Sequence, residues 1–194
     1  MLCCSSLLIK IGTFLGESYL NRQMYLQFCL TLVLLGITLV LSFLVNFGFF
    51  ELNFFVGPFR FTHWLGIIGS LFVFLFTPVF YVLKRKPIRA LSLLLKIHIF
   101  GNLFSFLLIS IHFAQQVSRP IRFFPDLGTG VILFIIIPLI IITGVIHRFG
   151  IMRRTKPSLN RYAKPHLNRY IHTSFSISLY ILIIVHSAHG FNLI

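Results

Sequence analysis

Residues 96–119 read KIHIFGNLFSFLLISIHFAQQVSR, an apolar run that contains two histidines and has a cation at each end. No charged residue occurs between Lys96 and Arg119, and a helix of this length crosses a hydrocarbon core of ~30 Å. The apolar residues are continuous rather than alternating with polar ones, which favours a helix over a strand. Because only helices and closed barrels satisfy their backbone groups in lipid, this stretch predicts a membrane-spanning helix. Residues 91–95 continue the pattern and would start the helix earlier.

Four more stretches of the chain lack charged residues over a similar length. They lie between Arg22 and Glu51, between Arg60 and Lys84, between Asp126 and Arg148, and after Arg169. Each is long enough for one helical crossing, so the sequence predicts an all-α membrane bundle of about five transmembrane helices. We expect an N-terminal segment over residues 1–22, a first transmembrane helix over 23–50 and a four-helix core over 61–190.

The composition leaves little room for anything else. The chain has 194 residues, of which 57% are hydrophobic and only 10% charged, whereas soluble domains carry about 25% charged residues. A nucleotide-binding domain does not fit beside five crossings, so any flavin or nicotinamide chemistry would belong to another chain. Cys3, Cys4 and Cys29 show neither zinc nor iron–sulfur spacing.

The basic residues predict the orientation of the chain in the membrane. Lys84, Arg85, Lys86 and Arg89 lie in one predicted loop, and the loop over residues 148–169 is also strongly basic. With five crossings both loops fall on the same side, which the positive-inside rule assigns to the cytoplasm. The N-terminus is then inside and the C-terminus outside, in a multi-pass protein of a bacterial or archaeal cytoplasmic membrane. The net charge of +14 therefore indicates topology and contact with anionic lipid, and we expect no nucleic-acid partner.

Two histidine pairs have the same spacing on two predicted helices. Thirteen residues separate His98 from His112, and thirteen separate His172 from His186. Fourteen helical steps leave two side chains ~40° apart on one face and ~21 Å apart along the axis. Both helices run in the same direction, so His98 is level with His172, and His112 with His186. Each level offers two axial imidazoles, which predicts two haems b, an inner and an outer one.

Other metals fit this pattern less well, because zinc and copper sites gather their ligands at one point. Gly66 and Gly69 lie level with the outer pair and Gly144 with the inner pair, while Gly101 follows His98 by about one turn. These four glycines would let a flat macrocycle approach the backbone, although membrane helices also use glycine for ordinary packing. Polar side chains beside the histidines are candidates to orient the imidazoles, namely Ser105, Ser110, Thr173 and Ser187.

The two helices resemble the core of dihaem membrane cytochromes b. Their organisation is similar to the ferric-reductase-like transmembrane family, which includes NADPH oxidases and the haem subunit of a methionine sulfoxide reductase system, and whose third and fifth helices carry the ligands. The resemblance rests on Leu95-Lys96-Ile97-His98 with Ile111-His112, and on Arg169-Tyr170-Ile171-His172 with Val185-His186. It covers residues 62–189. The chain departs from family oxidases in lacking a sixth helix and a flavin domain, and the second pair in that family is often one residue closer. Cytochrome b of quinol-oxidising complexes and cytochrome b561 proteins share the four-helix dihaem principle, and they remain open as alternatives.

The resemblance implies one-electron transfer through the membrane between two haems. We expect a membrane subunit that works with a separate flavin, iron–sulfur or cytochrome redox partner, and no catalytic side chain of its own. One alternative is a self-contained ferric reductase or quinol:acceptor oxidoreductase, with a quinone near His63 or His147. An alternative of another class is a transporter or assembly factor without redox function, which predicts no haem.

Overall fold

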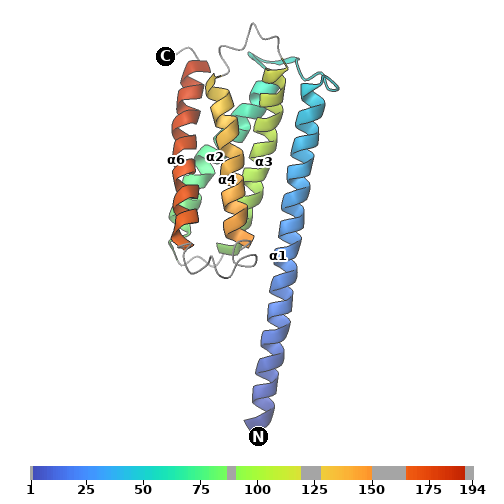
Figure 1. The fold of residues 1–194 in the computed structure, drawn as a ribbon, viewed down its shortest axis with the longest axis vertical. Helices are drawn as coiled ribbons and strands as arrows, with labels where there is room; N and C mark the ends of the chain where they lie inside the picture. Colours follow the sequence, from blue (N-terminus) through green and yellow to red (C-terminus); the bar gives the residue numbers. More distant parts are fainter. Residues whose placement is uncertain (1, 87–90, 119–127, 150–164, 191–194) are drawn as a thin grey trace. The chain divides into compact units, whose positions relative to one another are not determined.

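A computed structural model describes the backbone of residues 2–86, 91–118, 128–149 and 165–190, and the side chains of residues 22–86, 91–118, 128–149 and 167–190. The chain divides into two compact units, residues 1–33 and residues 34–194. The first unit is helical from Leu2 onward. Among the described residues, the second holds the rest of that helix, a short hairpin and four more helices, which are drawn in Figure 1. The described elements are α1 (Leu2–Asn46), β1 (Phe55–Val56), β2 (Phe59–Arg60), α2 (Phe61–Leu83), α3 (Leu91–Val117), α4 (Gly128–Phe149) and α6 (Pro165–Gly190).

The expected all-α membrane architecture is confirmed. Five described helices are long and apolar enough to cross a membrane, as in an integral multi-pass membrane protein. The second span begins and ends within the charges that bound it in the sequence, and the third begins early, at Leu91. Residues 2–22 belong to the same helix as the first span. The side of the membrane on which the termini lie stays a prediction, and residues 87–90 and 150–164, on which it partly relies, lie outside the described residues.

The first transmembrane helix ends at Asn46, four residues before the predicted boundary. Gly48 has a φ of +76°, which suits glycine because it has no Cβ. Its N–H donates to the Val45 carbonyl (3.1 Å), and the N–H of Phe49 donates to the Leu44 carbonyl (3.0 Å). This pair of bonds is a Schellman motif, which closes the helix by satisfying its last carbonyls. The apolar pattern continues through residues 47–50 and hides this turn from a reading of hydropathy.

Within the second unit, consecutive helices run in opposite directions (Figure 1). Helix α2 packs along α3, α4 packs along α6, and α3 contacts α4. We call the end of the bundle where α2 begins the hairpin end. We call the other end, where α2 and α4 finish with Lys84 and Arg148, the basic end.

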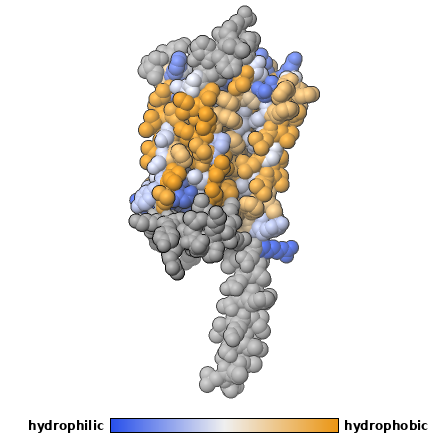
Figure 2. All heavy atoms as spheres, viewed as in Figure 1, coloured by the Kyte–Doolittle hydropathy of each residue, from blue (hydrophilic) through white to orange (hydrophobic). Residues whose placement is uncertain are grey.

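The buried core lies in the middle of the bundle. Phe106 of α3, Leu133 and Ile137 of α4, and Leu179 of α6 form one cluster. Leu179 stands halfway between His172 and His186 along its helix, so the cluster separates the two histidine levels. Many other large apolar side chains are exposed, and apolar residues cover the visible face of the helices (Figure 2). In lipid this surface is solvated by acyl chains.

One polar contact ties α6 to α2 at mid-depth. Pro78 lies inside α2 and has no N–H to donate to the Phe74 carbonyl four residues earlier. The Tyr180 hydroxyl lies 3.2 Å from that carbonyl oxygen and 2.8 Å from the Val73 carbonyl oxygen, and donates to them. The hydroxyl thus supplies a donor where the proline removes one, as the absence of water in lipid demands.

Candidate cofactor site

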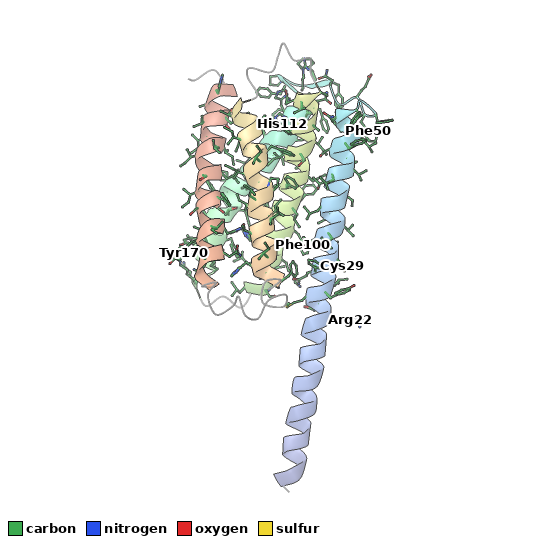
Figure 3. All side chains as sticks on the ribbon, in the orientation of Figure 1. Arg22, Cys29, Phe50, Phe100, His112 and Tyr170 are labelled. Carbon is green, nitrogen blue, oxygen red and sulfur yellow. The ribbon has the colours of Figure 1, made fainter. Side chains whose placement is uncertain are left out.

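The four predicted ligands lie on α3 and α6 at two levels of the bundle. His98 and His172 lie toward the basic end, one on each helix. His112 and His186 lie toward the hairpin end of the same helices. Figure 3 labels His112 at that end. It also labels Phe100 and Tyr170, each two residues from a histidine, near the basic end.

Helix α2 holds His112 from one side. The Nδ1 of His112 lies 3.0 Å from the Thr62 carbonyl oxygen. A carbonyl can only accept, so Nδ1 carries the proton and the Nε2 lone pair is the one that a metal can use. The ring lies directly against Gly66, where an added Cβ would come within 2.9 Å of His112 Cγ. The His63 ring stands edge-on to the His112 ring, with centroids 5.3 Å apart.

Helix α4 holds His172 through a hydroxyl. Thr143 Oγ1 lies 3.0 Å from His172 Nδ1. The same hydroxyl donates to the carbonyls of Leu139 and Ile140, both at 2.9 Å. When that hydrogen goes to one of these carbonyls, the hydroxyl oxygen can accept from an N–H at His172 Nδ1. In that tautomer the lone pair of His172 is on Nε2.

The contacts of α4 repeat at the other histidine of α6. Thr129 Oγ1 lies 2.9 Å from His186 Nδ1. An added Cβ on Gly130 would lie 3.4 Å from His186 Cε1, and one on Gly144 would lie 3.3 Å from His172 Cε1. Thr-Gly thus occurs twice on α4, at 129–130 and 143–144, with the same fourteen-residue step as the histidines.

These threonines were missed in reading the sequence, and the matching Thr-Gly step was the signal that would have found them. The predicted orienting residues were the serines and Thr173 of the ligand helices. The Thr173 hydroxyl instead donates to the Arg169 carbonyl at 2.9 Å. The Ser110 oxygen is buried without a hydrogen-bond partner among the described residues.

His98 has a different environment from the other three histidines. The Phe80 ring of α2 stacks on it, with centroids 4.1 Å apart and the planes inclined by 7°. The side-chain amide of Asn102 lies 3.2 Å from its Nδ1, through Nδ2. The other end of that amide, Oδ1, is buried and has no partner among the described atoms. Turning the amide over would let Oδ1 accept from Nδ1 and would free Nε2 for a metal, as at His112.

The predicted glycines divide into two groups. Gly66 and Gly144 lie against His112 and His172, whereas Gly69 and Gly101 serve the close approach of α2 and α3. A Cβ on Gly69 would come within 2.9 Å of the Ser105 carbonyl oxygen, and one on Gly101 would overlap the Phe72 ring. A role of these two glycines in holding a cofactor stays a prediction.

Cations gather at the basic end beside the inner histidines. The Lys84 ammonium stands over the Phe80 ring, 5.6 Å from its centroid. Partial burial, together with the like charges of Arg169 and Arg85, lowers the pKa of Lys84. The one acidic residue whose side chain is described, Glu51, lies in the loop at the hairpin end. A carboxylate or phosphate placed near Lys84 would therefore meet uncompensated positive charge.

The four histidines could serve a haem as two pairs of ligands, one imidazole from each ligand helix. No three His, Cys, Asp or Glu side chains gather into a metal-binding group in the described parts of the chain. Oriented Nδ1 groups and the glycine beside each of three rings fit such a ligand pair.

Comparisons with protein-family models, with curated proteins and with solved structures found no match to this chain.

Proposed function

We propose that the chain is a membrane electron-transfer protein that binds two haems b, the inner one through His98 and His172 and the outer one through His112 and His186. The observation that carries this proposal is the hydrogen bonding of the imidazole Nδ1 atoms. His112 donates Nδ1–H to a carbonyl oxygen that can only accept it, and His172 Nδ1 lies 3.0 Å from a hydroxyl that also donates within its own helix. Histidines that ligate metals through Nε2 are oriented in this way.

Bound haem would supply a one-electron iron couple at each level. The chain's own residues hold the imidazoles, keep water out and meet charge at the surface. The apolar cluster around Phe106 and Leu179 separates the two levels and excludes water between them. Lys84 and Arg169 at the basic end would attract the carboxylates of the inner haem.

The electron donor is then a separate protein or a membrane quinol. We place the basic end in the cytoplasm of a bacterial or archaeal cell, in line with the positive-inside rule. A flavin, iron–sulfur or cytochrome partner would deliver electrons there.

A second candidate is a self-contained reductase or quinol oxidoreductase, which the position of His63 favours. Its ring lies against that of His112, so a quinone or ferric acceptor bound at the hairpin end would sit beside the outer ligand. A quinone that copurifies with the protein and is lost in an H63A variant would support this candidate.

The test is a reduced-minus-oxidised visible spectrum of the purified full chain, with haem quantified per chain. We expect sharp low-spin b-type bands and about two haems. H98A should leave about one. The matched control is H189A, which removes an exposed histidine of α6 three residues beyond His186 and should leave both haems.

A colourless protein from haem-replete cells would overturn the proposal and leave the transporter or assembly-factor reading. Two haems in H98A would keep the cytochrome but move the inner ligand elsewhere.

A further inference from the structure

The segment between α1 and α2 carries an unusual density of exposed phenylalanine. Phe47, Phe49, Phe50, Phe54 and Phe55 are each about half exposed or more, from 48% for Phe50 to 70% for Phe49. Figure 3 labels Phe50 at the hairpin end. Single exposed apolar residues need no explanation, but contiguous apolar patches of this kind mark interaction surfaces.

The segment nevertheless contains regular structure, a short β-hairpin. Strands β1 and β2 pair antiparallel, Phe55 with Arg60 and Val56 with Phe59. Gly57 begins the turn between them with a φ of +62°, as two-residue hairpin loops require.

Contacts with α2 hold the hairpin in place. The indole N–H of Trp64 donates to the Val56 carbonyl at 2.8 Å. The Phe59 ring stands edge-on to the Trp64 ring, and the Phe54 ring stacks on the Phe61 ring at 5.0 Å. These contacts fix the hairpin, so its exposed apolar side chains are held at the surface of the protein.

Helix α2 locates this surface relative to the bilayer. It has 23 residues, a length of roughly 34 Å at 1.5 Å per residue, which by itself crosses the hydrocarbon core. The hairpin directly before it must then lie at the boundary between headgroups and acyl chains. Its polar side chains suit that level, since Arg60 donates to Asn53 Oδ1 at 2.6 Å and lies over the Phe55 ring. A long cation resting on apolar surface reaches the headgroups in this way.

We propose that the exposed phenylalanines of residues 49–55 insert into the leaflet at the hairpin end, so that the hairpin is an interfacial membrane anchor. Its occupant is lipid, because the exposed apolar side chains of α1, such as Leu39 and Phe43, lead into the patch through Phe47. Through Trp64 and Phe61 the anchor sets the depth of the first turn of α2, which contains Thr62. This inference does not depend on haem.

The experiment measures depth by electron paramagnetic resonance of the full chain in lipid nanodiscs. Spin labels are attached to F50C and F55C, one at a time, after the native cysteines are changed to serine. Accessibility to oxygen, which concentrates in lipid, is compared with accessibility to a water-soluble nickel chelate. The lipid reference is L71C on the exposed face of α2, and the water reference is K86C at the basic end.

Both hairpin labels should be several-fold less accessible to nickel than K86C and should lie at a depth between K86C and L71C. Nickel accessibility equal to that of K86C at both positions would overturn the proposal. Protection that occurs in native membranes but is lost in pure lipid would also overturn it, and would assign the patch to a protein partner instead. Two separate exposed positions guard against a single label that disturbs the hairpin.

Discussion

At the scale of single residues, each of the four histidines has a polar atom of a neighbouring residue within hydrogen-bond distance of its Nδ1. The Thr62 carbonyl decides the tautomer of His112 because it has no hydrogen to give, and the Thr143 hydroxyl holds the Nδ1 side of the His172 ring. Such partners decide which ring nitrogen meets a metal, and losing them typically costs 10–100-fold in metal affinity.

Thr143 therefore gives the first prediction. T143V removes the acceptor and should speed loss of the inner haem to apomyoglobin by about ten-fold, whereas T143S should restore the slow rate. The control is T38V, since Thr38 is also buried and donates to the carbonyl four residues earlier but belongs to α1. Equal rates for T143V and T38V would contradict a role for Thr143 in holding His172.

At the scale of elements, α2 and α4 act as backing for the ligand helices. The matching step of fourteen residues links Gly66 and Phe80 on α2 to His112 and His98 on α3. An equal step on α4 links Gly130 and Gly144 to His186 and His172. Antiparallel neighbours keep such a register over the whole length of the bundle, so each backing helix serves both levels.

Filling the space over Gly66 should abolish one level only. In G66L the side chain meets the His112 ring, where even a Cβ comes within 2.9 Å, so the ring must move. We expect about one haem per chain, as the inner site is untouched. G36L is the matched control, because a Cβ on that helical glycine meets nothing within 4 Å. Two haems in G66L would contradict this prediction, because the outer haem would then bind although the His112 ring had been displaced.

The tie between α6 and α2 gives a prediction about stability. Y180F should lower the free energy of unfolding in detergent by about 0.6 kcal/mol, the average for hydrogen bonds between membrane helices. In a P78A background the alanine N–H can serve the Phe74 carbonyl, so Y180F should cost less there. The comparison is a double-mutant cycle followed by circular dichroism, with Y170F on the exposed face of α6 as control. An unchanged cost would mean that the hydroxyl does not compensate for the proline.

At the scale of the whole molecule, the distribution of basic residues predicts which end of the bundle faces the cytoplasm. We predict that a membrane-impermeant thiol reagent added to intact cells labels S118C, at the hairpin end, but labels K86C only after the membrane is opened. The chain for this test carries serine at the native cysteines. The opposite result would place the basic end outside and reverse the proposed direction of approach of the electron donor.

The sequence by itself determined the five spans and the spacing of the histidines. Hydropathy and helical periodicity act locally, so a charge-free run and a fourteen-residue step need no knowledge of neighbours. The exact ends of the spans were less predictable. The turn at Gly48, which ends the first span, is made by backbone hydrogen bonds within an apolar run.

The tertiary structure alone decided which groups hold the histidines. Thr62, Thr129 and Thr143 meet them from neighbouring helices, where register, and not sequence distance, brings two atoms together. For the same reason Gly66 and Gly144 lie against histidine rings while Gly69 and Gly101 accept other neighbours. Contacts across helices depend on the rotation and sliding of each helix, and packing sets both.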